Sequence, residues 1–92
     1  MIRTFKHRGL ERFFKADDHR GIMARSGARI ERLLDRLDAV VKPEDMNLPG
    51  SKFRRLKGDR KDTYAVTVTG NWRITFRFEG EDAVDVNLED YH

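Results

Sequence analysis

The sequence contains no cysteine and no long hydrophobic run. Without cysteine, the chain has neither a disulfide framework nor a thiolate metal site, and this composition suits a reducing cytosol. No segment approaches the roughly 18 apolar residues that a membrane span requires, and residues 1–9 (MIRTFKHRG) lack the apolar segment of a signal peptide. We therefore expect a soluble cytoplasmic protein that does not bind membranes and that is stabilised by its hydrophobic core.

The length and the charge of the chain narrow its class. Its 92 residues suffice for one domain, residues 1–92, which buries about two-thirds of the surface that the unfolded chain exposes. Charged residues make up 38% of the chain and leave a formal net charge of +3. A net positive charge of this size is common, but it is compatible with a polyanionic partner such as a nucleic acid.

Two segments in the first half of the chain have the spacing of amphipathic helices. The first begins near Gly9 and ends within residues 16–21, and its apolar stripe consists of Leu10, Phe13 and Phe14. The second spans about residues 26–41, because Ser26 is a suitable N-cap and Pro43 cannot extend a helix. Its apolar residues recur at helical spacing and are Ile30, Leu33, Leu34, Leu37, Val40 and Val41.

Beyond a loop over residues 46–52 (MNLPGSK), the pattern changes to that of β-strands. Four segments are rich in β-branched and aromatic residues and are separated by turn formers: residues 53–57, 63–69, 72–79 and 83–89. Residues 2–5 suggest a short additional strand at the start. The sequence thus predicts an α+β domain that has a largely antiparallel sheet with two N-terminal helices packed on one face.

Alternation along the strands predicts one apolar and one polar face of the sheet. The residues expected to face the helices are Tyr64, Val66, Val68, Trp72, Ile74, Phe76, Phe78, Val84, Val86 and Leu88. The residues expected on the opposite face are Ala65, Thr67, Thr69, Arg73, Thr75, Arg77, Glu79, Asp85, Asn87 and Glu89. Because the helices need only one apolar face, we expect the second face to remain open, and we call it the open face.

The open face is expected to be basic. Residues 53–61 (FRRLKGDRK) bring together Arg54, Arg55, Lys57, Arg60 and Lys61. Arg73 and Arg77 add two cations from a neighbouring strand. A single arginine on such a face is most often merely solvated, but a shared basic surface is typical of nucleic-acid binding.

The last three residues, Asp90, Tyr91 and His92, extend the final predicted strand and are expected near these arginines. Cleavage of RNA through its 2′-hydroxyl needs a base, an acid and cations that stabilise the phosphorane, and these side chains supply all three without a metal. The histidine serves as acid or base near neutrality because its ordinary pKa is about 6.5. The competing interpretation is a frayed polar tail. We interpret His7 and His19 as surface residues.

Several motifs, taken in order, resemble the HigB toxins of the RelE/ParE superfamily of toxin–antitoxin systems. They are IRTFKHRGLERFF at 2–14, LKGDR at 56–60, YAVTV at 64–68, NWRITFRF at 71–78 and the terminal DYH at 90–92. The resemblance implies a RelE-like fold and a ribosome-dependent mRNA endonuclease that acts in the decoding site of the small subunit without a cofactor. It also implies an antitoxin partner, a HigA-like protein with a helix-turn-helix domain.

The same resemblance implies roles for individual residues. It implies that Asp90, Tyr91 and His92 form the active-site tail. It also implies that Arg73 contacts a phosphate and that Asn71 and Lys57 contact the RNA. We add Arg77 to the expected phosphate-binding residues because it shares the open face with Arg73.

One position departs from the family pattern. Some members have a histidine before the LKGD turn, where this chain has Arg54. Because the pKa of arginine lies above about 12, Arg54 can neutralise phosphate charge but cannot act as a general base. Either His92 or Asp90 then removes the proton, or the protein is slower, or its catalytic arrangement differs.

Two other functions are compatible with the sequence. A ParE-like toxin would inhibit gyrase and would need no nuclease site, and the proton-transfer residues of the tail argue against it. A non-catalytic RNA-binding module would need only the arginines. Cleavage of RNA by the protein would distinguish the endonuclease from both alternatives.

Overall fold

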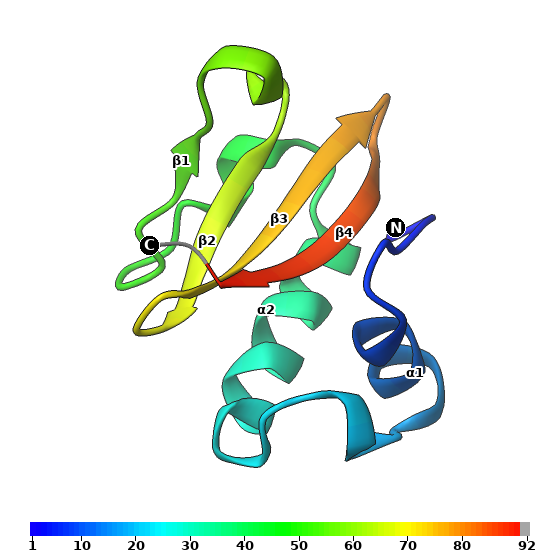
Figure 1. The fold of residues 1–92 in the computed structure, drawn as a ribbon. Coiled ribbons are helices and arrows are strands. Elements are labelled where there is room, and N and C mark those ends of the chain that lie inside the picture. The colour runs from blue at the N-terminus through cyan, green and yellow to red at the C-terminus, as the bar shows by residue number, and fades with distance from the viewer. Residues whose placement is uncertain (91–92) are drawn as a thin grey trace.

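The computed structural model of the protein describes residues 1–90, in which two α-helices accompany a four-stranded antiparallel sheet (Figure 1). The helices are α1 (Arg8–Ala16) and α2 (Gly27–Ala39), and the strands are β1 (Arg54–Arg55), β2 (Tyr64–Thr69), β3 (Trp72–Glu79) and β4 (Asp82–Asp90). The strands lie in the order β1-β2-β3-β4. The predicted α+β fold is confirmed. Tyr91 and His92 lie outside the described residues.

The helix α1 begins at a histidine that sequence interpretation had placed on the surface. His7 is the N-cap of α1, and its Nδ1 accepts a hydrogen bond from the backbone N–H of Leu10 at 3.0 Å. This ring is half-buried, so the interpretation of His7 as a surface residue was wrong. A residue before a helix caps it only if a side-chain acceptor turns toward the free N–H groups, and the imidazole nitrogen fills this role. His19 is exposed, as expected.

The helix α2 is two residues shorter at its end than the apolar spacing predicted. It ends at Ala39, and the C-cap residue Val40 is extended, with φ −80° and ψ 158°. Val41 therefore lies outside the helix, and its exposed fraction is 50%, so the prediction that it belongs to the apolar stripe of this helix was wrong. Ser26 holds the predicted N-cap position, but its side chain makes no capping hydrogen bond.

The predicted first strand is present only as two isolated bridges. The first residues run parallel to β4, with Ile2 opposite Ala83 and Phe5 opposite Val86. The backbone N–H groups of Arg3 and Lys6 donate to the carbonyls of these two β4 residues, each at 2.8 Å. The N-terminal segment therefore covers the outer edge of β4.

The predicted strand over residues 53–57 is reduced to Arg54 and Arg55. A 3-10 turn at Gly58–Arg60 follows almost at once, and Gly58 has a left-handed backbone with φ 72°. Such a backbone favours glycine and ends the extended conformation. This turn carries Arg60 back toward the sheet.

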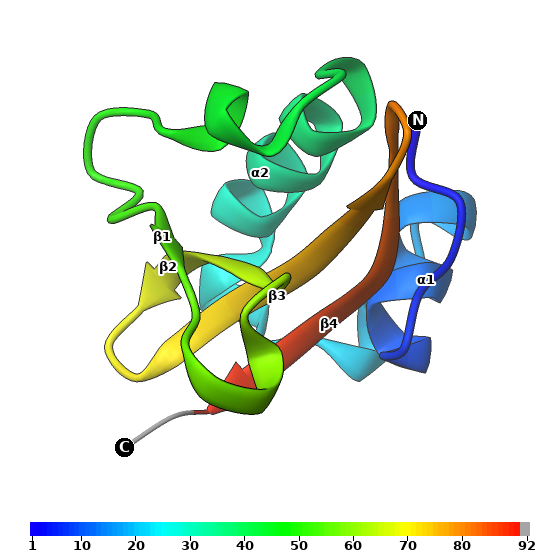
Figure 2. The same ribbon diagram turned by 90° about the horizontal axis from the view of Figure 1, so that it is seen from above.

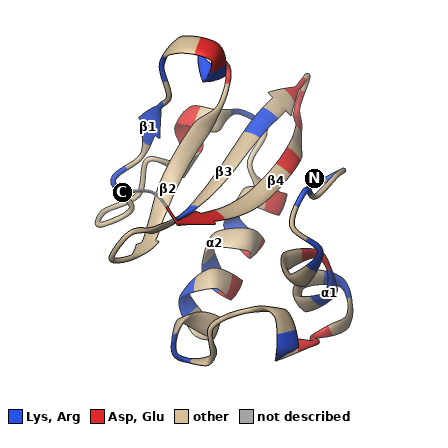
Figure 3. Ribbon diagram, viewed as in Figure 1, with Lys and Arg blue, Asp and Glu red and all other residues tan. Residues whose placement is uncertain are grey.

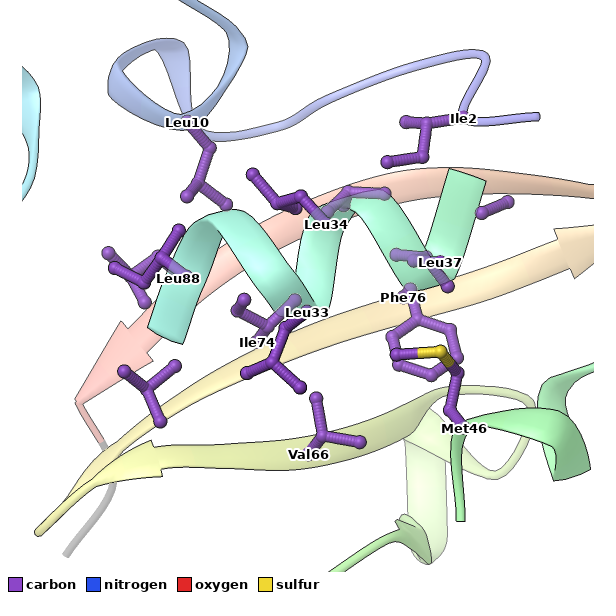
Figure 4. Close-up of a cluster of buried hydrophobic side chains, with 14 of the residues drawn as sticks. Ile2, Leu10, Leu33, Leu34, Leu37, Met46, Val66, Ile74, Phe76 and Leu88 are labelled. Atoms are coloured by element: carbon purple, nitrogen blue, oxygen red, sulfur yellow. The ribbon is translucent and has the colours of Figure 1, made fainter. Parts of the chain in front are cut away.

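The core lies between the sheet and the helices. Figure 2 shows α2 on one side of the sheet and α1 beyond its β4 side. The buried side chains come from both helices and from three strands, and Figure 4 draws Leu10, Leu33, Leu34, Leu37, Val66, Ile74, Phe76 and Leu88 among them. Neither helix is both long enough and apolar enough to cross a membrane, as far as residues 1–90 are concerned.

A bulge in β4 breaks the alternation that the sequence predicts. The pairing of β3 with β4 shifts by one residue between Thr75 and Arg77. Val84 consequently lies opposite Arg77, and opposed residues in a ladder share a face. The prediction that Val84 faces the helices was wrong. The shift lies at Asp85, whose φ of 54° is left-handed.

Candidate functional site

The face of the sheet that the helices leave uncovered carries most of the predicted phosphate-binding residues. Figure 3 shows Lys and Arg on β1, on β3 and on the connection between β1 and β2, with Asp and Glu on β4. Arg73 lies opposite Glu89 in the ladder of β3 and β4. Arg54 lies opposite Ala65, and Ala65 lies opposite Thr75, so the register places Arg54 on the same face as Arg73. The arginines of the open face are therefore accompanied by carboxylates.

One carboxylate, Glu89, links several side chains of this face. Its Oε1 accepts hydrogen bonds from Arg60 Nη1 at 3.0 Å and from Arg73 Nη2 at 3.2 Å. Its Oε2 accepts from a second Arg60 nitrogen, from Thr75 Oγ1 at 3.0 Å and from Asn87 Nδ2 at 3.3 Å. We call Glu89 and these four partners the Glu89 network.

The network keeps Glu89 ionised. The hydrogen bonds from Arg60, supplemented by those from Thr75 and Arg73 and by the charge of Arg60, lower the pKa of Glu89 to about 2, although partial burial acts in the opposite direction. The same contact raises the pKa of Arg60. A carboxylate with such a pKa is a poor general base near neutrality. Glu89 is therefore suited to holding guanidinium groups rather than to moving protons.

The two arginines of the network differ in exposure. The side chain of Arg73 is 12% exposed, that of Glu89 is 20% exposed, and that of Arg60 is 42% exposed. Arg73 is thus fixed close to the sheet, while Arg60 presents part of its guanidinium group to solvent. An arginine that is already ordered loses less entropy when it binds a phosphate.

A second ion pair, between Arg77 and Asp85, lies further along the same face. Arg77 Nη1 donates to Asp85 Oδ2 at 2.7 Å, and another Arg77 nitrogen is 3.9 Å from Glu79. The bulge of β4 places Asp85 beside Arg77, because Val84 takes the position directly opposite Arg77 in the ladder. Arg77 is only half-buried, so this pair is accessible.

The remaining predicted RNA contacts lie at the margins of the open face. Lys57 is exposed and directly precedes the 3-10 turn that carries Arg60. Asn71 is exposed in the turn between β2 and β3, two residues before Arg73. Arg54 is half-buried, and its Nη1 donates to the carbonyl of Lys52 at 3.3 Å.

The predicted catalytic tail is described only at its first residue. Asp90 is exposed and lies opposite Trp72 at the end of β4. Trp72 packs against the core, so alternation puts Asp90 on the side of the sheet opposite to that of Glu89. Tyr91 and His92 lie outside the described residues. The structure thus brings Arg73 together with Arg60, but it does not place Asp90 on their face.

Sequence interpretation missed the central residue of this arrangement. Glu89 was expected on the open face but not in the site, and Arg60 was counted only as part of a basic stretch. The available signal was the alternation of the last strand, which places Glu89 on the same face as Arg73. A correct register between the two strands would have paired Glu89 with Arg73. The reach of Arg60 depended on the 3-10 turn, which the sequence did not reveal.

Two comparisons place the chain among known proteins. Residues 3–92 match the profile of the HigB-like toxin family, described as the RelE-like toxin of the type II toxin-antitoxin system HigB. The chain is also 40% identical over 92 residues to Endoribonuclease HigB from Proteus vulgaris, and the alignment covers 100% of both chains.

Proposed function

The chain belongs to the HigB-like family of RelE-like toxins of type II toxin–antitoxin systems, and from this premise we propose that it is a ribosome-dependent endoribonuclease. The family assignment confirms the resemblance that its motifs suggested. Its proposed substrate is mRNA held in the decoding site of the small ribosomal subunit, and cleavage there stops translation and growth. The name of the Proteus vulgaris relative supports the nuclease activity.

The observation that carries this proposal is the pair of ordered arginines on the open face. Arg60 and Arg73 share the carboxylate of Glu89, and Arg73 belongs to the NWRITFRF motif of the family. A fixed guanidinium group beside a strand end is suited to bind a phosphodiester and to stabilise the charge that develops on it. Lys57, Arg54, Asn71 and Arg77 extend the proposed RNA-binding surface.

The proposed reaction is transesterification within the RNA. The 2′-oxygen forms a bond to phosphorus while the bond from phosphorus to the 5′-oxygen breaks, which leaves a 2′,3′-cyclic phosphate and a free 5′-hydroxyl. A base takes the proton of the 2′-hydroxyl and an acid gives a proton to the departing 5′-oxygen. Arginine stabilises the extra negative charge between these steps.

The proton transfers are assigned to the tail. We assign Asp90, Tyr91 and His92 as the catalytic residues. Of the two candidates for the base, His92 is favoured over Asp90, because alternation along β4 puts Asp90 on the other face of the sheet from Arg73. Glu89 is unsuited to this role because its carboxylate already accepts hydrogen bonds from Arg60, Arg73 and Thr75, which lower its pKa. Arg54 is unsuited because its charge is permanent. The proposed mechanism uses neither a metal ion nor a cofactor, because the tail supplies the proton transfers and the arginines of the open face supply the charge stabilisation.

The proposed partners follow from the family. A type II toxin has an antitoxin, and we propose a HigA-like protein with a helix-turn-helix domain. Action on ribosome-bound mRNA places the proposed site of action in the cytoplasm. Expression of the toxin alone is expected to stop growth, and co-expression of the antitoxin is expected to restore it.

Primer extension on mRNA held in the decoding site tests the nuclease. Cleavage by the purified protein is expected only with ribosomes and is expected to persist in EDTA. Replacement of His92 by alanine is expected to lower the rate about 10²- to 10⁴-fold, as the loss of a general acid or base does. His19→Ala is the matched control, because His19 is an exposed histidine remote in sequence from the tail. No cleavage by folded wild-type protein, together with inhibition of DNA supercoiling, would instead identify a gyrase inhibitor.

A further inference from the structure

We propose that a pocket beside the Arg77–Asp85 pair is a subsite for one ribonucleotide of the bound RNA, where it binds a phosphate and a ribose hydroxyl. The pocket has a volume of about 220 Å³, and its lining includes Lys6, Asp59, Arg60, Thr75, Arg77 and Asp85. We call it the Arg77–Asp85 pocket. The inference rests on the proposed action on RNA and extends it to a position next to the cleaved bond.

Three segments that are far apart in the sequence build this pocket. The N-terminal segment contributes Lys6, the 3-10 turn before β2 contributes Asp59 and Arg60, and the strands β3 and β4 contribute Arg77 and Asp85. The N-terminal segment is fixed by its backbone hydrogen bonds to β4. The cations of the pocket are therefore held by the fold itself rather than gathered on one loop.

The bulge of β4 has a specific role in this construction. Asp85 has a left-handed backbone, with φ 54°, and its N–H donates to Thr4 Oγ1 at 2.8 Å. A non-glycine residue in this conformation is uncommon, and bulges that re-aim a side chain are frequent next to active sites. Here the bulge directs a carboxylate to Arg77 and also attaches the segment that carries Lys6.

The chemistry of the lining selects a phosphate and a sugar rather than a base. Three cations and two carboxylates line the pocket: Lys6, Arg60 and Arg77, and Asp59 and Asp85. No aromatic side chain is among the lining residues within the described part of the chain, so no platform for base stacking is present there. The cations suit a phosphate, and a carboxylate oxygen accepts a hydrogen bond from a 2′-hydroxyl.

The volume of the pocket limits its ligand to one unit of a chain. Clefts for drug-sized ligands usually have about 300–1,000 Å³, and this pocket is smaller. It is open to the same face as the Glu89 network, with which it shares Arg60 and Thr75. A strand of RNA whose phosphate lies at Arg73 and Arg60 would therefore place a neighbouring nucleotide in this pocket.

Salt-dependent binding of a short single-stranded RNA tests the subsite without any need for cleavage. The full chain is titrated with an RNA of a few nucleotides and with DNA of the same sequence at several salt concentrations. Lys6→Gln is expected to weaken RNA binding several-fold and to reduce the slope of log K against log salt by about 0.7, which is the value for one phosphate contact on a single strand. Lys42→Gln is the matched control, because Lys42 is an exposed lysine between α2 and the following 3-10 turn.

A second variant tests the recognition of the ribose. Asp85→Asn is suited to this, because asparagine also tolerates a left-handed backbone. The wild-type protein is expected to bind RNA more tightly than DNA, and the variant is expected to lose part of this difference. Changes in the backbone NMR signals of Lys6, Arg60 and Asp85 on addition of RNA locate the bound strand, and thermal denaturation verifies that each variant is folded.

Each result decides for or against the subsite. Equal effects of Lys6→Gln and Lys42→Gln, equal affinity of the wild type for RNA and DNA, no detectable binding, or NMR changes confined to other surfaces would overturn it. The cleavage assay separates this failure from that of the proposed function. Cleavage by wild-type protein with no effect of the pocket variants on binding rejects the subsite alone, whereas binding in the pocket without cleavage rejects the nuclease alone.

Discussion

The two faces of the sheet are built from the same strands but are held together by different forces. On the face toward the helices, Ile74, Phe76 and Leu88 pack into an apolar core. On the open face, the residues between them join ion pairs, as Arg77 does with Asp85 and Glu89 does with two arginines. The comparison indicates that one face supplies most of the stability of the fold, while the other carries an ordered pattern of charges, which we propose binds RNA.

The largest effect on stability is expected on the helix side. Phe76 has an exposed fraction of 0% and lies at the centre of the core. Phe76→Ala removes these contacts and leaves a cavity, so the free energy of unfolding is expected to fall by about 3–5 kcal/mol. Urea denaturation measures this change. Phe14→Ala is the matched control, because Phe14 is only partly buried, and an equal loss in both variants would contradict the assigned position of the core.

A smaller loss of stability and a larger loss of activity are expected on the open face. Glu89→Gln keeps the shape of the side chain but removes the charge that Arg60 and Arg73 share. The free energy of unfolding is expected to fall by about 1–3 kcal/mol, because hydrogen bonds to a charged group are lost. The rate of RNA cleavage is expected to fall more than the affinity for RNA, because both cations remain but lose their alignment.

Glu81→Gln is the control for Glu89→Gln, since Glu81 is an exposed glutamate in the turn between β3 and β4. Urea denaturation and cleavage kinetics are measured for both variants. If Glu89→Gln raised the affinity for RNA and left the cleavage rate unchanged, the carboxylate would be a competitor of the phosphate and not a support for the arginines.

Acid is expected to weaken the open face before it affects the core. The pKa of Glu89 is about 2 in the folded protein, below its ordinary value of 4.5. The ionised form therefore stabilises the fold above about pH 4.5, and this contribution declines as the pH falls toward about 2. The difference in urea midpoint between the wild type and Glu89→Gln is expected to shrink over this range. A difference that stays constant from pH 6 to pH 2 would show that the charge of Glu89 is not responsible.

The smallest effect is expected at the N-cap of α1. Burial, and secondarily the charge of Arg12, lower the pKa of His7 below 6.5. Neutral His7 therefore stabilises the fold above about pH 6.5, and this contribution is lost as the pH falls through the lower folded-state pKa. His7→Asn keeps a capping acceptor but does not titrate, so the stability of this variant is expected to be flatter between pH 7.5 and 5.

His7→Ala provides the reference for this experiment. Its loss of stability near pH 7.5 is expected to be about 1 kcal/mol, which is typical for the loss of a cap. Thermal denaturation at each pH measures the three proteins together. A parallel pH dependence in the wild type and in His7→Asn would assign the transition to another group.

The difference between the two faces also explains which features could be predicted from the sequence. The core could be predicted because apolar alternation, as in Ile74 and Phe76, and helical spacing, as in Leu33 and Leu37, follow directly from burial. The family could be predicted because its motifs lie in order along the chain. The length of β1 and the end of α2 could not be predicted closely, because both depend on the local backbone, which is left-handed at Gly58 and extended at Val40.

The arrangement of the open face depended on register, which alternation alone does not give. A single bulge at Asp85 moved Val84 to the face of Arg77, and only a known register pairs Glu89 with Arg73. The contact from Arg60 to Glu89 joins residues that are 29 positions apart through a turn of irregular backbone. The roles of Tyr91 and His92 remain predictions from the family.

The attachment of the N-terminal segment to β4 has a consequence for the order of folding. The bond from Asp85 N–H to Thr4 joins residues that are 81 positions apart, so it closes almost the whole chain into one loop. Contacts of such separation form late, after nearer partners have reduced the entropy of closure. On a translating ribosome they form only after β4 has emerged. The pocket that contains both Lys6 and Asp85 therefore cannot be complete before β4 has left the ribosome.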